Sequence, residues 1–225
     1  MSNAVRVTTQ CSAFAHPDFV VSCDDTIPQG DIKLLTSFLE QSVQAGTRFI
    51  EGDLITFGSM LFRVARSEDF LTLEEPDLES FPIEWIQGVT RSMQLMRQQR
   101  DIADSVGLGD EIDPPSIRSS LLVGGDLESY DEDILLERLD SVASDSGWFV
   151  GRRDTVLNYE DDGTMRRISI YQAILNWPRI SGFLGLPAGC RIEITAGKPL
   201  FTRNGKTLRI KQGSLIDALT RTRRQ

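Results

Sequence analysis

Histidine and cysteine carry much of the nucleophilic and metal chemistry of proteins, and this chain contains few of either. His16 is the only histidine, so a Ser-His-Asp or Cys-His arrangement would have to use it as the base. The cysteines are odd in number and form no CxxC pair, unlike a disulfide framework or a zinc site; they are Cys11, Cys23 and Cys190. We therefore expect a packed or surface histidine, three cysteines buried as small apolar side chains, and a reducing compartment.

Clusters of carboxylates could support a cation site or acid–base catalysis. The acidic run at residues 160–163 lacks the alternating ligands of a calcium loop, so a solvated loop explains it better. The pairs Glu74-Glu75 and Asp24-Asp25 are adjacent in sequence, and adjacent residues on a strand point to opposite faces of a sheet. These patterns do not indicate a shared catalytic site.

Glycine-rich phosphate motifs are also incomplete. Gly107-Leu108-Gly109 lacks a third glycine and follows a predicted helix rather than a strand, and Gly124-Gly125 is not followed by the lysine of a P-loop. We therefore predict no catalytic residue, no cofactor and no metal, and a protein that is not an enzyme.

The net charge of −9 is distributed unevenly along the chain. Residues 1–113 carry −11, residues 114–225 carry +2, and the last 28 residues alone carry +7. An acidic surface suits a basic protein partner better than nucleic-acid phosphates, although the charge could also serve solubility alone. The basic end has few aromatic residues besides Phe201, so we interpret it as a solvated hairpin. Without a secretory signal or a membrane-length apolar run, we expect a cytoplasmic protein with no membrane contact.

The first half of the chain is predicted to begin with two strands and a helix. The strands are expected at residues 5–8 and 19–23. Asp31 should cap the helix, because its carboxylate can accept the free N–H groups of the first turn, and Gly46 should end it. The inward face of the helix carries Ile32, Leu35, Leu39 and Val43.

A meander and a long helix should complete this half. The meander strands are expected at 47–51, 54–57, 60–65 and 70–73. The segment Glu74-Glu75-Pro76-Asp77 should then break the pattern, because proline removes a donor from the ladder. The helix is predicted over 82–106, with Pro82 in its first turn and Gly107 after its end.

The second half is predicted to be a separate domain behind a proline-containing linker. The expected elements are strands at 119–123, 147–150 and 190–195, a helix at 131–143, a polar loop at 152–163, a strand passing into a helix at 168–177, and a short turn at 180–186. The helix at 131–143 should bury Ile134, Leu135, Leu139 and Val142. Asn204-Gly205 predicts a type I′ hairpin. Ser214 should cap a last helix that faces inward with Leu215, Ile216 and Leu219.

These elements predict an α+β fold with two compact domains, each a small, mostly antiparallel sheet with packed helices. The expected boundaries are 1–112 for the first domain, 113–122 for the linker and 123–225 for the second domain.

One stretch of the second half has a characteristic set of packing and turn residues. These are Asp145-Ser146-Gly147-Trp148-Phe149 with Gly151, then Ile168-Ser169-Ile170-Tyr171, Trp177-Pro178, Phe183-Leu184 and Leu186-Pro187-Ala188-Gly189. In this region, residues 143–195, the chain resembles immunity protein family thirty-three, which occurs in bacterial polymorphic-toxin loci. Family members often carry a second acid or an aromatic residue where this chain has Arg152-Arg153. Parts of the first half, at 46–52, 73–77 and 85–99, look like the companion domain of longer members.

The resemblance implies a cytoplasmic immunity protein that neutralises a cognate toxin, delivered by a secretion or contact-dependent system, by covering its active site. The implied partner is a toxin protein with a basic surface, which acidic loops would bind. The candidate contact residues are Glu74, Glu75, Asp77, Arg152, Asp154, Tyr159, Asp161 and Asp162. Each of them could instead belong to a solvated loop. The alternative function is a non-catalytic regulatory or small-ligand-binding adaptor.

Overall fold

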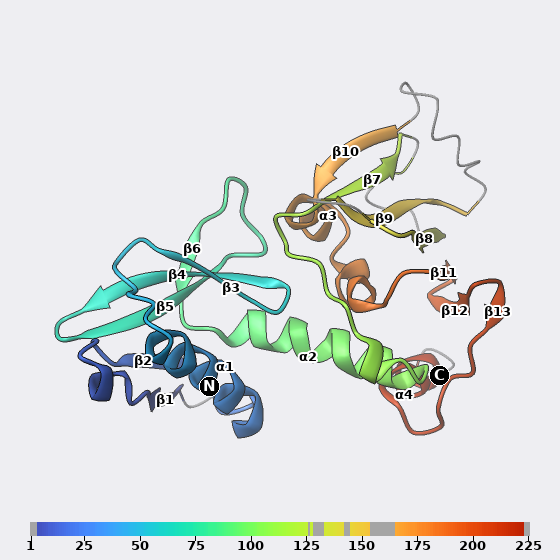
Figure 1. The fold of residues 1–225 in the computed structure, drawn as a ribbon. Helices are drawn as coiled ribbons and strands as arrows, with labels where there is room; N and C mark the ends of the chain where they lie inside the picture. The colour runs from blue at the N-terminus through green and yellow to red at the C-terminus, as the bar shows by residue number, and fades with distance from the viewer. Residues whose placement is uncertain (1–3, 126, 128–132, 142–144, 154–164, 223–225) are drawn as a thin grey trace. The chain divides into compact units, whose positions relative to one another are not determined.

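The computed structural model describes residues 4–125, 127, 133–141, 145–153 and 165–222 (Figure 1). The chain divides into two compact units, one up to Met96 (unit 1) and one from Arg97 onwards (unit 2). The linker expected at 113–122 lies inside unit 2, and the domain boundaries inferred from sequence stay a prediction. The α+β class is confirmed, because each unit contains a mostly antiparallel sheet with helices.

Unit 1 contains a six-stranded sheet in the order β1-β2-β5-β4-β3, with β6 also paired to β5. The strands are β1 (Ala4–Thr8), β2 (Phe19–Asp24), β3 (Leu54–Phe57), β4 (Met60–Ser67), β5 (Phe70–Pro76) and β6 (Trp85–Gln87). Only the β2–β5 pair is parallel among these described pairings. The other elements are η1 (Cys11–Phe14) and α1 (Gln29–Gln44).

The inward face of α1 is confirmed, since Ile32, Leu35, Leu39 and Val43 are all buried. Burying each such side chain contributes on the order of 2 kcal/mol to folding. Gly46 follows the helix with φ +100°, a left-handed conformation that glycine adopts at little cost. The predicted cap was wrong: Pro28 is the N-cap residue, and Asp31 lies in the first turn, where its charge still favours the helix dipole.

Two further predictions for unit 1 were wrong. Residues 47–51 form no strand, and the Phe49 N–H donates instead to Nε2 of His16 (3.0 Å). The helix expected over 82–106 begins only at Thr90, as α2 (Thr90–Ser105). Residues 85–87 extend the sheet, because Trp85 pairs with Pro76 and β5 therefore runs through the expected break. Gly88 then turns the chain with φ +102°, and its N–H donates to the Leu73 carbonyl (3.0 Å).

Unit 2 contains a seven-stranded sheet in the order β10-β7-β9-β8-β11-β12-β13. The strands are β7 (Ser120–Gly124), β8 (Ile134–Arg138), β9 (Asp145–Arg152), β10 (Met165–Ser169), β11 (Cys190–Thr195), β12 (Lys198–Arg203) and β13 (Lys206–Thr207). The β7–β9 pair is parallel and the other described pairs are antiparallel. The helical elements are η2 (Gly109–Glu111), α3 (Ile170–Asn176), η3 (Pro178–Gly185) and α4 (Leu215–Thr222), together with the end of α2.

The helix expected at 131–143 was wrong, because residues 134–138 form strand β8 between β9 and β11. Ile134, Leu135 and Leu136 are at most 1% exposed, so both faces of this strand are buried. A continuous apolar run is typical of such a strand and cannot be told from a buried helix by periodicity. Leu139, expected inside, is 41% exposed, and Val142 lies outside the described residues.

Several local predictions for unit 2 are confirmed. The strand β10 passes into α3, which begins with a capping box formed by Ser169 and Gln172. Asn204 and Gly205 have φ values of 48° and 75°, as a type I′ turn requires. In α4, Ile216 is buried, but Leu219 is 49% exposed and not inward as predicted. In the part of the chain that the structure describes, no helix is both long and apolar enough to cross a membrane.

Candidate functional site

The loop at residues 77–84, called here the acidic loop, joins β5 to β6 and projects beyond their ends (Figure 1). Its base closes like a hairpin, since the Asp77 N–H donates to the Glu84 carbonyl (2.8 Å) directly after the Pro76–Trp85 pair. The loop includes one predicted contact residue, Asp77, and begins just after two others, Glu74 and Glu75.

The carboxylate of Asp77 holds the acidic loop in one conformation. It accepts hydrogen bonds from the Ser80 hydroxyl (2.8 Å), the Glu79 N–H (3.2 Å) and Nη1 of Arg91 (2.8 Å). The Ser80 hydrogen bond and then these other interactions hold the pKa of Asp77 below its ordinary value. Arg91 also forms an ion pair with Glu79 (3.4 Å), so this side chain of α2 fastens the loop at two carboxylates.

Phe81 is the most exposed large apolar residue of the acidic loop, at 69%. Glu79 is also exposed, with 77% of its side chain accessible, and so are Pro82 and Glu84. An aromatic side chain beside carboxylates on a preorganised loop suits a protein surface that combines an apolar depression with cationic groups. Phe81 is not among the contact residues predicted from sequence, because Pro82 was expected in a helix. An aromatic residue between a polar residue and a proline was its signal in the sequence.

The neighbouring acids Glu74 and Glu75 have different environments. Glu74 is partly exposed and accepts a hydrogen bond from Nε of Arg63 (2.7 Å), whose guanidinium lies over the ring of Trp85 (5.2 Å). Glu75 points to the other face and is 2% exposed. Its two carboxylate oxygens accept the N–H groups of Arg91 (3.0 Å) and Ser92 (2.6 Å), which are the free donors of the first turn of α2.

Burial raises the pKa of Glu75, although the hydrogen bonds from Ser92 and Arg91 act in the opposite direction. The three predicted acids of unit 1 are therefore close together in the sequence but do not lie on one surface. Glu74 and Asp77 reach solvent, whereas Glu75 supports the start of α2.

The second predicted group of contact residues follows β9 in unit 2. Arg152 is exposed at the end of that strand, and its neighbour Arg153 forms an ion pair with Glu193 (3.1 Å). The remaining members of the group, Asp154, Tyr159, Asp161 and Asp162, lie outside the described residues. Their role as contact residues stays a prediction.

Arg138 is a buried charged residue of unit 2, at 4% exposure. Its guanidinium donates to the carbonyls of Ser146 (3.2 Å), Leu186 (2.5 Å) and Asp113, and to the Asp113 carboxylate (2.9 Å). It also lies over the ring of Trp148 (5.8 Å). Burial lowers the pKa of Arg138, and Asp113 opposes that shift. These contacts join segments that are distant in sequence, which is a structural role.

The single histidine is hydrogen-bonded at both ring nitrogens, and the three cysteines are buried. Nδ1 of His16 donates to the Pro17 carbonyl (2.7 Å), so Nε2 is left to accept the Phe49 N–H. All three cysteines are free and at most 4% exposed, and burial raises the pKa of each thiol. Across the described ranges, no group of three His, Cys, Asp or Glu residues could hold a metal ion.

Comparison with protein families identifies an Imm33-like domain at residues 98–199. The match begins one residue after the start of unit 2 and includes the whole stretch, 143–195, that carried the resemblance in sequence. The expected family relationship of the second half is therefore confirmed, whereas the companion domain in the first half stays a prediction. No curated protein and no solved structure matches the chain.

Proposed function

We propose that this chain is an immunity protein, which binds a cognate bacterial toxin and neutralises it by covering its active site. The observation that carries the proposal is the Imm33-like domain at residues 98–199. In this proposal the toxin is delivered by a secretion or contact-dependent system, and the immunity protein protects the cytoplasm of the producing cell. Neutralisation by covering a site needs a complementary rigid surface and no catalytic group.

The charge of the first half supports a toxin with a basic surface. Up to Met96 the sequence has 6 lysine and arginine residues against 14 aspartate and glutamate residues, a net charge of −8. Opposite fields on two proteins accelerate their encounter, and they disfavour partners of the wrong charge. The same charge disfavours a nucleic-acid partner, because phosphates require a cationic surface.

The acidic loop is the best-supported contact surface among the described residues. It is fastened by Asp77 and Arg91, so little conformational entropy is lost when it binds. Phe81 is the proposed anchor, and the acidic loop also carries the carboxylates of Asp77, Glu79 and Glu84. The burial of Glu75 supports a structural role for that residue, as a stabiliser of α2, rather than a direct contact.

Co-expression tests the proposal directly. The protein encoded next to this chain should stop growth when it is produced alone in a bacterial host, and co-production of this chain should restore growth. The two proteins should also co-purify. A neighbour that is harmless, or whose toxicity this chain does not reduce, would contradict the proposal and favour a regulatory or ligand-binding adaptor.

Variants of the acidic loop test its place in the interface. Phe81→Ala should weaken the complex by roughly 30-fold or more, as removal of a central aromatic anchor does. Phe70→Ala is the matched control, because Phe70 is also exposed (42%) but lies at the start of β5. Isothermal titration calorimetry gives both values. Equal losses for the two variants would remove the acidic loop from the interface.

The second predicted loop has its own test. Replacing both Asp161 and Asp162 by lysine should weaken the complex by a large factor if this loop faces a basic surface, because like charges then meet. An unchanged affinity would remove it from the interface.

A further inference from the structure

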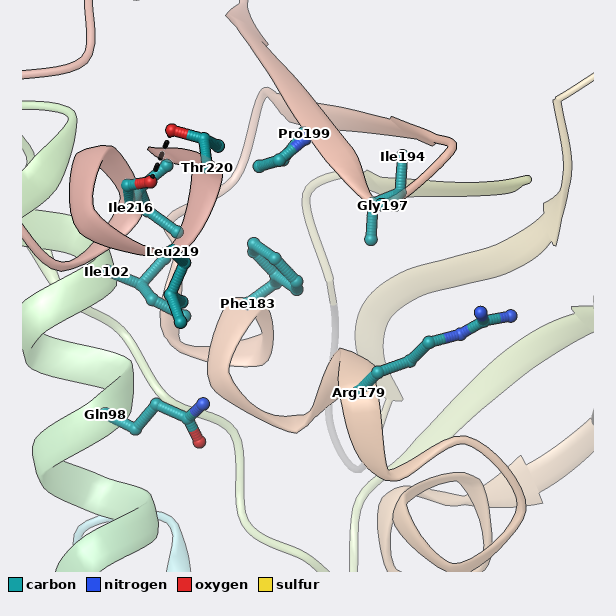
Figure 2. A pocket seen from close by; sticks show the side chains of 10 residues that line it. All are labelled: Gln98, Ile102, Arg179, Phe183, Ile194, Gly197, Pro199, Ile216, Leu219 and Thr220. Carbon is teal, nitrogen blue, oxygen red and sulfur yellow. Dashed lines mark hydrogen bonds between the residues drawn. The ribbon is translucent and has the colours of Figure 1, made fainter. Parts of the chain in front are cut away.

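Unit 2 contains a hollow of about 300 Å³, which we call the α4 hollow (Figure 2). Gln98 and Ile102 come from the end of α2, Arg179 and Phe183 from η3, and Ile194, Gly197 and Pro199 from β11, β12 and the turn between them. Ile216, Leu219 and Thr220 come from α4, which lies beyond the residues matched by the family. The last helix therefore turns a surface of the Imm33-like domain into a concave site.

Most of the lining is apolar. Ile102, Phe183 and Ile194 are between 2% and 8% exposed, and they form a well-packed base. Leu219 lines the hollow with 49% of its surface exposed. Ile216, one turn earlier in the same helix, is buried. The Thr220 hydroxyl donates within α4, to the carbonyls of Ile216 (2.9 Å) and Asp217 (3.0 Å). The hollow therefore favours an apolar guest.

Arg179 gives the hollow a positive end. Among the described residues that line the hollow it is the one that carries a charge, and none of them is a carboxylate. Its side chain is exposed and extends outward from η3, with the guanidinium directed away from Phe183 and Leu219 (Figure 2). Arg179 forms no hydrogen bond or ion pair with the residues that the structure describes, and Lys198, next to Gly197 and Pro199 in the chain, is also exposed. An exposed guanidinium beside an apolar surface suits a carboxylate attached to an apolar group.

We propose that the α4 hollow binds an apolar side chain of the toxin that stands next to a carboxylate, with Arg179 as the partner of that carboxylate. This inference rests on the proposed function and adds a second contact to it. The acidic loop selects positive charge, whereas the α4 hollow selects an apolar group with negative charge. A partner that satisfies both must carry both features, which makes recognition more selective than general attraction between opposite charges.

A small probe tests the hollow without the toxin. In NMR spectra of the full chain, 3-phenylpropionate should shift the signals of Ile102, Phe183 and Leu219. The neutral analogue 3-phenylpropionamide should bind about tenfold more weakly, and Arg179→Gln should remove the difference between the two probes. Shifts elsewhere, or equal binding of acid and amide to the unchanged protein, would overturn the proposal.

Two leucines of nearly equal exposure test the same surface in the complex. Leu219 (49% exposed) lines the hollow, whereas Leu200 (50% exposed) does not. Leu219→Glu should weaken toxin binding by tenfold or more, because it places a carboxylate where the guest's apolar group would sit. Leu200→Glu should change binding less than about threefold. Thermal unfolding of both variants confirms that each still folds.

The outcomes separate the two proposals. If the unchanged chain binds the toxin and both leucine variants bind equally well, the α4 hollow is not part of the interface, while the proposed function stands. If the unchanged chain does not bind the toxin, the proposed function is wrong, and a toxin side chain cannot be the occupant of the hollow. The probe experiment then shows whether the hollow recognises an apolar group with a carboxylate.

Discussion

Among the residues that the structure describes, unit 1 and unit 2 each have a buried charged side chain that meets backbone polar groups, but the two charges are opposite in sign. In unit 1 the Glu75 carboxylate accepts two N–H groups at the start of α2. In unit 2 the Arg138 guanidinium donates to three carbonyls and to one carboxylate. Burial favours the neutral form of both groups, so it raises the pKa of Glu75 and lowers the pKa of Arg138.

Glu75 and Arg138 differ in the sequence separation between the charged residue and its hydrogen-bond partners. The partners of Glu75 are 16 and 17 residues away and belong to one helix turn. The partners of Arg138 are up to 48 residues away and belong to three separate segments. Loss of Glu75 should therefore loosen a single helix end, whereas loss of Arg138 should loosen the packing of unit 2.

The largest expected effect is that of Arg138→Met. Removing one partner of a buried charged network costs about 3–5 kcal/mol, because the carbonyls and the carboxylate lose their donors. Urea denaturation, followed by tryptophan fluorescence to which the buried Trp148 and Trp177 of unit 2 contribute, measures this loss. Arg191→Met is the matched control: Arg191 is paired with Glu137 and Glu193 but is 36% exposed, and its loss should cost at most about 1 kcal/mol. Equal losses would contradict the special role of Arg138.

Glu75→Ala should have the next largest effect, a loss of about 2 kcal/mol. Its removal leaves two N–H groups at the start of α2 without an acceptor in a buried site. Glu74→Ala removes the adjacent acid, which forms a surface ion pair with Arg63, and should cost less than about 1 kcal/mol. Hydrogen exchange at Arg91 and Ser92 should accelerate only in the Glu75 variant. Acceleration in both would mean that the surface pair also holds the helix.

Gly205→Ala should lower the stability of unit 2 through a local change of backbone conformation that involves no buried charge. Nothing lies within 4 Å of a Cβ atom at this position, so the cost comes from the positive φ of 75° alone and should be about 1 kcal/mol. Thermal unfolding checks the value. A loss as large as that of Arg138→Met would show that unit 2 depends on the hairpin as strongly as on its buried charge.

The smallest expected effect is a change in the pH dependence of stability in Glu75→Gln. The pKa of Glu75 is raised above the ordinary value of 4.5 in the folded protein, so the folded state retains a proton that the unfolded state has lost. The contribution of Glu75 to stability is therefore largest below pH 4.5 and falls as the pH rises through the folded pKa. Glutamine does not titrate, so the advantage of the wild type over the variant should shrink as the pH rises. An advantage that grows instead would show that the hydrogen bonds from α2 outweigh burial.

Much of the local structure could be predicted, because the signals were themselves local. The Asn204-Gly205 turn, the end of α1 at Gly46 and the passage from β10 into α3 depend on a few neighbouring residues. The helix predicted at 131–143 failed for a different reason. Ile134, Leu135 and Leu136 form a strand because β9 and β11 lie on both sides of it, which periodicity cannot show.

The candidate site shows the same limit. Alternation along β5 correctly placed Glu74 and Glu75 on opposite faces. Which of the two is buried depends on where α2 begins, and the sequence analysis placed that start at Pro82 instead of Thr90. With the helix placed at 82–106, Phe81 stood directly before its first residue and was not recognised as part of an exposed loop. Arg138 could not have been found from sequence, because its acceptors come from three distant segments.

The three buried thiols make the opening of each unit measurable. Cys11 and Cys23 lie in unit 1 and Cys190 lies in unit 2, and their burial leaves an alkylating reagent no direct access. Alkylation then requires a transient opening, so its rate at each cysteine reports the free energy of the opening that exposes it. Mass spectrometry of the alkylated peptides would separate the two units within one sample. Toxin binding to either unit should slow alkylation in that unit, so the cysteines would report which unit the toxin stabilises.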